Sequence, residues 1–571
     1  MSAMSISEVL MRNSGDIEDL SSLDHTETVK ADSHYLRGTI REGLDDPVTG
    51  AIGEDDAKLL RYHGSYLQDD RDIRDERRKQ KLEPAYQFMI RVRVPGGVVT
   101  PSQWLAMDRM TRDYGSGTLR VTSRQTFQVH CILKENLKNA IASVNACLLD
   151  TFATSGDVNR NVLCSSNPMA SRNHAVILEW ARTLSNHLLP KSNAYHELWL
   201  DGERVDPEKE CEPLYGKRYL PRKFKIAIAV PPTNDIDVFK EDLGLIAIFD
   251  GEKLQGFNLT VGGGLATTHG DRTTYPRLGD LIGFVTPYHV IAAAEHVIGI
   301  QRDFGDRVSR RHSRLKYTVD KMGVGAFKEE LERRIGFQLD PVRPYAFDRN
   351  GDRFGWTRTP DDLWHLCLYL RAGRIANAPD THHLDGMRAI AEAHDGQFRL
   401  TSNQNVIVAN ISPDNRDRIE SIVKQYGLDE YQHAKPVRLD AISCVALPTC
   451  GLAMAEAERY LPQILQKIEA ILERHGLQDD PILFRISGCP NGCSRPYLGE
   501  IALIGRALGR YDLRLGADNR GERLNTVYRE NIDELAVLGE LDALFARYTG
   551  ERVHGESFGD FVRRVIPLGN E

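Results

Sequence analysis

The feature that most constrains the fold of this chain is an internal repeat. Residues 117–132 have the sequence GTLRVTSRQTFQVHCI and residues 396–411 have GQFRLTSNQNVIVANI, and seven of these sixteen positions are identical without a gap. In each copy a segment with helical periodicity separates this strand-like segment from an earlier one, at residues 88–100 and 364–376. The pattern predicts a duplicated unit in which strands and helices alternate.

The correspondence extends further along the chain. Residues 161–168 and 443–450 follow their copies at similar distances, and residues 223–235 parallel residues 483–495. We therefore predict an α+β fold whose halves are related by a pseudo-twofold axis, with three compact domains and an N-terminal arm. The interface between such halves is a natural place for a large ligand. The predicted boundaries are 1–84 for the arm and 85–153, 154–350, 351–430 and 431–571 for the repeated units.

Length and charge exclude several other classes of protein. A chain of 571 residues is too long for a single hydrophobic core. The net charge of −8 argues against a general nucleic-acid binder, and no apolar run approaches the ~20 residues of a membrane span. The polar, acidic N-terminus lacks the apolar segment of a signal peptide, so we interpret it as a loosely ordered arm. We expect a cytoplasmic protein that binds neither nucleic acid nor membrane.

Four of the nine cysteines come as two pairs. Cys444 and Cys450 are separated by five residues and Cys489 and Cys493 by three, with one predicted helix between the pairs. The GCPNGC loop that carries the second pair contains a proline and two glycines, which break regular structure and allow the sulfur atoms to approach. An odd number of cysteines argues against a disulfide framework. The isolated cysteines, interpreted as small buried hydrophobic residues, are Cys131, Cys147, Cys164, Cys211 and Cys367.

The spacing of the paired thiols leaves three interpretations open. Structural zinc sites usually space each pair as C-x2–4-C, and the gap between Cys444 and Cys450 lies outside that range. Iron–sulfur clusters also use four thiolates, with more varied spacing. The thiols could also be unrelated. The spacing favours a cluster, and a non-catalytic binding protein stabilised by zinc or by a cluster is the alternative from a different class.

Cations alternate on strands that otherwise have the composition of a buried sheet. Arg91 and Arg93 share a face of one strand, and Lys223 and Lys225 share a face of another. Buried cations are costly unless anions meet them, so an anionic ligand is expected, with a solvated edge face as the alternative. We interpret residues 120–130 as a third strand, whose polar face would carry Arg120, Thr122, Arg124, Thr126, Gln128 and His130.

A further basic run lies between residues 302 and 316. Such a run is usually a solvated face or a nucleic-acid patch, and the acidity of the whole chain argues against the second. A polyanionic cofactor would account for this run and for the strand faces together. Its cations are Arg302, Arg307, Arg310, Arg311, Arg314 and Lys316.

These motifs resemble the sirohaem sulfite and nitrite reductases. The resemblance covers nearly the whole chain, and it is most specific in CVALPTC (444–450) with GCPNGCSR (488–495). LRVTSRQTFQVH (119–130) and NRNVLCSSNP (159–168) support it. Within the family, residues 61–84 and YLPRKFK (219–225) are most similar to the haemoprotein (beta) subunits of the NADPH-dependent sulfite reductases.

The resemblance implies a role for each candidate residue. By matching motifs, Arg91, Arg160, Lys223 and Lys225 would bind sulfite on the open face of sirohaem, and Cys493 would be the axial thiolate of its iron. A 4Fe–4S cluster would be held by Cys444, Cys450, Cys489 and Cys493. The carboxylates of sirohaem would lie near Arg120, Arg124, Gln128 and residues of the 302–316 run.

The reaction that the resemblance implies is the six-electron reduction of sulfite to sulfide in cysteine biosynthesis. The sequence contains no dinucleotide fingerprint after a strand and no flavin motif. NADPH, FAD and FMN are therefore expected only on a separate flavoprotein (alpha) subunit, which would supply the electrons. A sirohaem nitrite reductase and a ferredoxin-dependent sulfite reductase would use the same cofactors and are the nearest alternatives.

Overall fold

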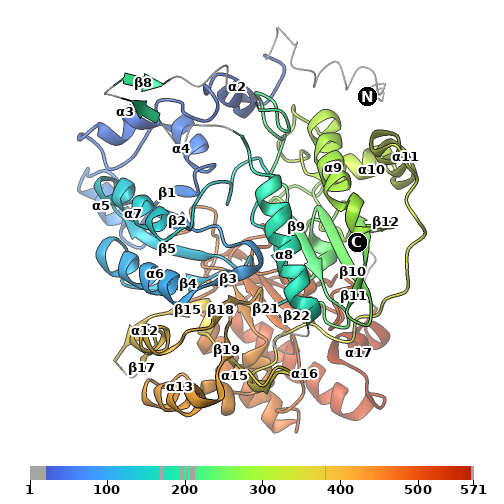
Figure 1. Ribbon diagram of the computed structural model, residues 1–571. Coiled ribbons are helices and arrows are strands. Elements are labelled where there is room, and N and C mark those ends of the chain that lie inside the picture. The colour runs from blue at the N-terminus through green and yellow to red at the C-terminus, as the bar shows by residue number, and fades with distance from the viewer. Residues whose placement is uncertain are drawn as a thin grey trace.

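Four five-stranded sheets form the framework of the computed structural model, in two pairs with matching strand order (Figure 1). The structure describes residues 21–166, 172–191, 198–200, 203–205, 212–379 and 381–567. The first twenty residues of the predicted arm and Cys211 lie outside the described residues. The prediction of a duplicated α+β fold is confirmed, whereas the domain boundaries stay a prediction. Two short hairpins accompany the sheets: β7 (Leu198–Leu200) with β8 (Glu203–Val205), and β16 (Asn377–Ala378) with β17 (Thr381–His382).

The first pair of sheets is antiparallel, and each sheet is packed against two helices in a ferredoxin-like arrangement. One sheet has the order β1 (Ser65–Asp69), β2 (Tyr86–Arg91), β5 (Phe127–Ile132), β4 (Leu119–Val121) and β15 (Arg374–Ile375), with α6 (Pro101–Tyr114) and α7 (Lys134–Ala146). The other has β13 (Gly355–Arg358), β14 (Trp364–Leu368), β19 (Val406–Ile411), β18 (Gln397–Leu400) and β3 (Val98–Val99), with α12 (His383–Ala393) and α13 (Pro413–Gln425).

These two sheets exchange edge strands. Strand β15 belongs in sequence to the second copy but pairs with β4 of the first, and β3 of the first copy pairs with β18 of the second. Gly97 and Gly373 lie at the two crossings, both with positive φ, where a side chain would collide with the backbone of the other copy. The exchange is reciprocal, as a pseudo-twofold axis requires.

One hydrophobic core joins the two exchanged sheets. Trp104 of α6 is completely buried between Phe127 of the first sheet and Phe398 of the second, with ring centroids 5.3 and 4.5 Å apart. Helices α6 and α12 pack against each other above this core. Because aromatic side chains bury large areas, this shared packing makes the two copies one folded unit.

The second pair of sheets repeats a mixed topology in which two parallel pairings are followed by two antiparallel ones. The first of these sheets has β6 (Leu163–Cys164), β9 (Ile226–Ala229), β10 (Leu243–Asp250), β11 (Lys253–Val261) and β12 (Asp280–Val285). The second has β20 (Ile442–Ser443), β21 (Phe484–Ser487), β22 (Ile501–Ala507), β23 (Arg510–Leu515) and β24 (Thr526–Ile532).

Each mixed sheet has its own hydrophobic core and its own helices. The first core is covered by α8 (Arg172–His187), α9 (Val290–Phe304), α10 (Leu315–Met322) and α11 (Val324–Ile335). The second is covered by α14 (Pro436–Leu439), α15 (Leu461–Arg474), α16 (Glu534–Glu551) and α17 (Phe558–Val565).

Two glutamines attach the mixed sheets to the exchanged pair in the same way. Gln125 donates to the carbonyl of Cys164 at 2.8 Å and accepts from its N–H at 3.1 Å, and Gln404 makes the same two bonds with Ser443 at 2.8 and 3.2 Å. This match aligns β6 with β20, so the pairings put Ala227 in the place of Arg485. The ungapped parallel between residues 223–235 and 483–495 is therefore wrong by two positions.

The prediction of one strand over residues 120–130 is also wrong. The chain reverses between β4 and β5, and Gln125 at the turn has a φ of 52°. Arg120 pairs with Gln128 across the hairpin, whereas Arg124 lies in the turn itself. The polar alternation that suggested a continuous strand comes from two short strands and the tight turn between them.

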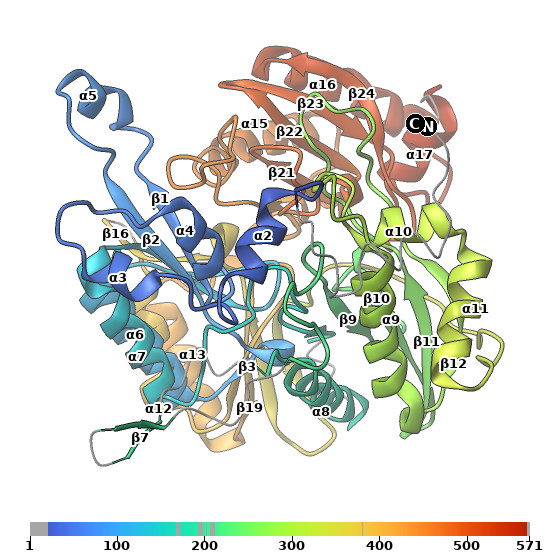
Figure 2. The ribbon, with the colours of Figure 1, turned by 90° about the horizontal axis from the view of Figure 1, so that it is seen from above.

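The described part of the N-terminal segment is more ordered than an arm. It forms α2 (His25–Ala31), α3 (Ile40–Asp45), α4 (Glu54–Leu60) and, between β1 and β2, α5 (Arg74–Lys79), which projects from the body in Figure 2. Helix α2 buries Glu27, Val29 and Lys30. Within the described residues, no helix has the length and apolar character needed to cross a membrane.

Candidate functional site

A row of polar side chains crosses the first ferredoxin-like sheet. Arg91 of β2 pairs with Gln128 of β5, Gln128 pairs with Arg120 of β4, and Arg120 pairs with Arg374 of β15. Directly opposed residues in antiparallel strands point to the same face, so these four side chains lie side by side. His130, two residues along β5, shares this face and is 2% exposed. Three of the residues proposed from the sequence are thus brought together.

The corresponding row of side chains in the second sheet is less polar. The matching positions on β14, β19 and β18 are Cys367, Ile407 and Arg399. Cys367 and Ile407 belong to a closed apolar cluster with Ala409, and Phe354 packs against it. Of the two rows, only that of the first copy is therefore polar at every position.

Arg120 joins the polar row to the half of the molecule that carries the paired thiols. Its Nε donates to Glu458 at 2.9 Å and its Nη2 donates to the carbonyl of Ser443 at 3.1 Å, next to Cys444. Arg374 donates to the same Glu458 at 2.6 Å. Arg120 is 3% exposed, and Glu458 supplies the negative charge that such burial requires.

The turn between β4 and β5 connects the remaining parts of the site. Arg124 donates to Glu241 at 3.0 Å and to the carbonyl of Asn161 at 2.6 Å. These acceptors lie just before strands β10 and β6 of the first mixed sheet. Ser123 donates to the carbonyl of Cys493 at 2.8 Å. Arg124 is therefore anchored to protein groups, although its Nε is buried and has no hydrogen-bond partner in the described residues.

Lys223 and Lys225 are cations that no acidic group neutralises directly. They flank the fully buried Phe224, which pairs with Asn159, and this places both lysines beside Arg160. Among the described residues, neither ammonium group has a hydrogen-bond or ion-pair partner. Burial and the charge of Lys225 hold the pKa of Lys223 well below its usual range, and burial beside Arg124 lowers the pKa of Lys225 to about 7.

Arg91 and Arg160 are only weakly satisfied by the protein. The guanidinium group of Arg91 makes one long hydrogen bond, 3.5 Å to the carbonyl of Thr154, and Arg160 donates to the carbonyl of Gly156 at 3.2 Å. Within the described part of the chain, the Nε atoms of both guanidinium groups and both ring nitrogens of His130 are buried without a hydrogen-bond partner. Buried polar atoms are nearly always paired in proteins, so these orphans fit a ligand that supplies acceptors.

Tyr66 on β1 belongs to the same group but was not found from the sequence. The guanidinium carbon of Arg91 lies 5.6 Å from the centroid of its ring. Burial opposes ionisation of its hydroxyl, yet Arg160 and Arg91 outweigh it and lower the pKa of Tyr66 to about 8. A phenol with this pKa beside several cations indicates a local excess of positive charge.

The four paired thiols gather at the other side of the site. Cys489 is buried, Cys444 and Cys450 are half-buried and Cys493 is exposed. Burial and the neighbouring thiolate of Cys493 raise the pKa of Cys444 to about 12, and those of Cys450 and Cys489 to about 11. These mutual effects require the thiols to be neighbours.

The four thiols have the chemistry of cluster ligands, because 4Fe–4S clusters are held by four cysteine thiolates. Hydrogen bonds to sulfur are present, from the N–H of Gly488 to Cys444 at 3.2 Å and from Asn491 to Cys489 at 3.4 Å.

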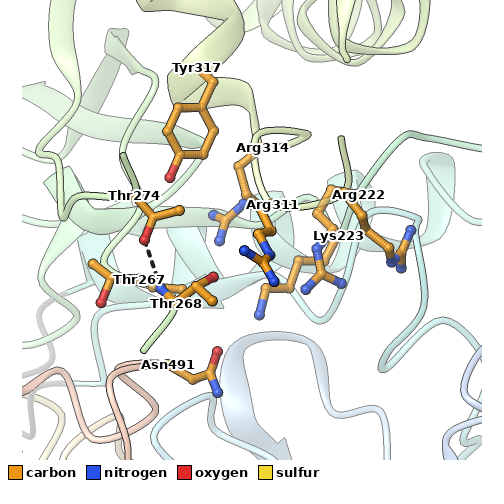
Figure 3. Close-up of a pocket in the computed structure, with 11 residues that line it drawn as sticks. Arg222, Lys223, Thr267, Thr268, Thr274, Arg311, Arg314, Tyr317 and Asn491 are labelled. Atoms are coloured by element: carbon orange, nitrogen blue, oxygen red, sulfur yellow. Dashed lines mark hydrogen bonds between the residues drawn. The ribbon is translucent and has the colours of Figure 1, made fainter. Parts of the chain in front are cut away.

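A pocket of about 150 Å³ joins the thiol loop to the cations of the other copy (Figure 3). Asn491 enters it from the GCPNGC loop, which is fixed by a bond of 3.0 Å from the N–H of Thr267 to the carbonyl of Pro490. Opposite lie cationic side chains, of which Arg222 has no hydrogen-bond or ion-pair partner among the described residues. The basic lining residues are Arg222, Lys223, Arg310, Arg311 and Arg314.

The cations of the basic 302–316 run fall into two groups, those that line the pocket and those that do not. Arg310, Arg311 and Arg314 line the pocket, where each is paired with one acidic residue: Asp157, Asp271 and Asp242, respectively. Arg302 and Arg307 do not line it, and Lys316 is fully buried against backbone carbonyls. The pairs explain how Arg310 and Arg314 tolerate burial, and no sequence signal identifies these acidic partners because they lie far away in the chain.

Two family models match the chain. The one described as "Nitrite/Sulfite reductase ferredoxin-like half domain" matches residues 79–147 and 357–426, the two exchanged sheets. The one described as "Nitrite and sulphite reductase 4Fe-4S domain" matches residues 179–339, which lie in the copy without the paired cysteines. The common topology of the two mixed sheets explains how a model of this domain can match the copy that lacks the thiols.

Relatives and a solved structure resemble the chain over nearly its whole length. The sulfite reductase (NADPH) hemoprotein beta-component of Myxococcus xanthus is 56% identical over 95% of this chain and 96% of its own. The protein of that name from Bacillus subtilis is 55% identical over 94% and 95%. The structure of the Mycobacterium tuberculosis NirA protein shares the fold, with a TM-score of 0.76 at 22% identity over 96% and 97% of the two chains. The chain belongs to the family of sulfite reductase (NADPH) haemoprotein beta-components.

Proposed function

We propose that this chain is an enzyme, the haemoprotein component of a sulfite reductase that reduces sulfite to sulfide in cysteine biosynthesis. The observation that carries the proposal is the pocket in which Asn491 of the thiol loop faces Arg222 and Lys223 of the other copy. Asn491 also donates to Cys489 at 3.4 Å, which supports an anion site near thiolates that suit a cluster. Family membership connects the two features to sulfite.

The residues present fit sirohaem and a 4Fe–4S cluster. Cys444, Cys450, Cys489 and Cys493 would hold the cluster, and Cys493 is the exposed member that would also reach the sirohaem iron. The unpaired nitrogens of Arg91, Arg160 and His130 leave donors for an anionic group. When bound, the two cofactors supply the iron that binds sulfur and the store of electrons.

Arg91 and Arg160 would hold the anion rather than release protons. A guanidinium group stays charged at all relevant pH values and presents several N–H donors in one plane. The few protein contacts of both side chains leave donors for the oxygen atoms of sulfite. Preorganised donors of this kind stabilise negative charge without reorganisation during the reaction.

Lys223 and Lys225 would deliver protons. The reduction converts the three oxygens of sulfite into three waters, which takes up six protons with the six electrons. The lowered pKa of each lysine makes its ammonium group a better acid near neutral pH than an ordinary lysine. Each Nζ would donate to an oxygen of the bound anion and then be reprotonated from solvent.

Electrons would come from NADPH through a flavoprotein (alpha) subunit that carries the FAD and FMN. The word "component" in the names of the relatives supports a partner of this kind. A cytoplasmic location, where NADPH is available, stays a prediction from the sequence. The chain alone is expected to be inactive with NADPH.

The test is a comparison of kcat/KM for sulfite and nitrite in anaerobically purified protein, with reduced viologen as the donor. Viologen replaces the flavoprotein, so the result reports on this chain alone. Preference for sulfite, with sulfide released, supports the proposal. Preference for nitrite, with ammonia released, would reassign the enzyme to nitrite reduction. Protein with stoichiometric zinc and no haem would contradict both.

A further inference from the structure

Helix α2 buries two charged side chains that the proposed chemistry does not use. Glu27 and Lys30 are each 1% exposed, although they lie in a segment expected to be a loose arm. Removing charges from water costs several kcal/mol unless good partners replace the water. Apart from each other, their partners are Leu220, Arg307 and Asp157, which lie in three chain segments beside the cationic side of the pocket.

Lys30 holds the segment that leads into the pocket. Its Nζ donates to Glu27 at 2.5 Å and to the carbonyl of Leu220 at 2.7 Å, and lies 3.6 Å from Asp157. The N–H of Leu220 in turn donates to the carbonyl of Asp157 at 3.0 Å. Leu220 precedes Arg222 by two residues, so these bonds fix where the Arg222–Lys223 wall begins.

Glu27 forms an ion pair with Arg307, which lies just before the second cationic wall of the pocket, formed by Arg310, Arg311 and Arg314. Arg307 is 4% exposed, and it forms an ion pair with Glu27 while donating to the carbonyl of Tyr219 at 2.7 Å. The N–H of Asp24, which caps α2, donates to the carbonyl of Arg307 at 2.9 Å. Arg307, three residues before the pocket-lining Arg310, is thereby tied to α2 and to the segment that leads to Arg222.

Asp157 closes the network at the pocket itself. Arg310 donates to Asp157 at 3.0 Å and to the carbonyl of Pro221 at 3.3 Å, and Arg310 lines the pocket. Asp157 is 2% exposed and has Lys30 on one side and Arg310 on the other. The charge of Lys30 thus acts on Arg310 through one shared carboxylate.

We propose that α2 is a bracket that sets the separation and the charge of the two cationic walls, and that Glu27 and Lys30 are positioning residues for a small oxyanion bound between them. Neither side chain lines the pocket. They act on Arg222, Lys223 and Arg310 through the backbone of residues 219–221 and through Asp157. The identity of the anion as sulfite depends on the proposed function, whereas the bracket itself does not.

The test replaces Lys30 by methionine, which keeps the length of the side chain and removes its charge. Loss of the bond to Leu220 displaces the wall formed by Arg222 and Lys223. A misplacement of about 1 Å in a site lowers the catalytic rate by up to ~10²-fold. We expect KM for sulfite to rise about tenfold, with kcat changed less than about twofold. As a readout independent of turnover, the rise in Tm of the holoenzyme with added sulfate should shrink, because that rise measures the affinity for the anion.

Arg438→Met is the matched control. It removes a two-bond ion pair with Glu469 that joins α14 to α15, outside the pocket lining, at 2.7 and 2.5 Å. Its sulfite KM and sulfate response should equal those of the unsubstituted protein. Equal effects of Lys30→Met and Arg438→Met on the anion would overturn the bracket, since both would then reflect general destabilisation.

Glu27→Gln gives a second, milder test in case Lys30→Met does not fold. It keeps an acceptor for Arg307 but removes the charge, so a weaker sulfate response with normal cofactor content is expected. An unchanged response in Glu27→Gln and in any folded Lys30→Met would also overturn the proposal. If the unsubstituted protein fails to reduce sulfite, the proposed function falls, and the sulfate response still decides about the bracket.

Discussion

Lys225 has no acidic partner in direct contact among the residues that the structure describes, and burial beside Arg124 lowers its pKa to about 7. The ammonium form is therefore present below this pH and is lost as the pH rises through it. We expect kcat/KM for sulfite to fall on the alkaline side of neutrality if Lys225 donates protons. Lys225→Arg, which stays charged, should lack this fall but have a lower maximum, because arginine does not release its proton.

The measurement is kcat/KM with reduced viologen across about pH 6 to 9 for both proteins. Superimposable pH profiles for Lys225→Arg and the unsubstituted protein would remove Lys225 from the proton path.

Lys223→Met is expected to lower kcat/KM for sulfite by about 10²-fold, which is the usual contribution of one general acid.

Cys493 carries the greatest expected effect of any single residue. It is the exposed member of the thiol group, and its carbonyl accepts from Ser123 at 2.8 Å. Cys493→Ser should lose nearly all sulfite reduction and the spectroscopic coupling between sirohaem and cluster. Absorption and electron paramagnetic resonance spectra check this, with Cys131→Ser as the control outside the thiol group. A wild-type spectrum for Cys493→Ser would contradict the assignment.

The residues that the sequence identifies lie in local motifs, and those it misses act across long distances in the chain. The cysteine spacing and the alternating cations are visible within a few positions. Glu458 pairs with Arg120, and Asp157 with Arg310, more than 150 residues apart in each case. No periodicity marks such partners, because only the fold brings them together. Tyr66 is missed for the same reason.

At the scale of elements, two glutamines attach the mixed sheets to the exchanged pair. Gln404 is 1% exposed and makes both of its bonds with the backbone of Ser443, beside Cys444. Gln404→Leu leaves the buried N–H of Ser443 without its partner, at a cost of about 1–3 kcal/mol, whereas the carbonyl of Ser443 keeps the bond from Arg120. We expect the free energy of unfolding, measured by urea denaturation, to fall by about 1–3 kcal/mol.

Gln463→Leu on the exposed face of α15 is the matched substitution. It should change the free energy of unfolding by less than about 0.5 kcal/mol, as surface changes usually do. Similar free energies of unfolding for Gln404→Leu and Gln463→Leu would show that the hydrogen bonds of Gln404 do not contribute to stability.

The elements also show where pattern reasoning fails. The repeat predicted the duplication correctly, because its identities fall on paired strands and their turn. The same alternation concealed the hairpin between β4 and β5. These strands are three and six residues long, and the polar residues of the turn between them continue the alternation. Gln125, at a positive φ without being glycine, gave no turn signal.

At the scale of the whole molecule, we expect duplication to have left one site rather than two. In the counterpart of the polar row, Cys367 and Ile407 are apolar and Phe354 packs against them. We expect one sirohaem and one 4Fe–4S cluster for each chain, and hence about five iron atoms and four labile sulfides. Metal analysis with haem quantitation checks this. Two haems for each chain would show that the second row is still a functional site.

The exchange of edge strands has a consequence for synthesis on the ribosome. Strand β4 is complete at Val121, but its neighbour β15 begins only at Arg374, about 250 residues later. At about 5–20 residues per second, the first sheet keeps an unpaired edge for roughly 10 to 50 s. Unpaired edges invite association with other chains. The nascent protein therefore passes through a period in which chaperones, rather than its own fold, must keep this edge from pairing with other chains.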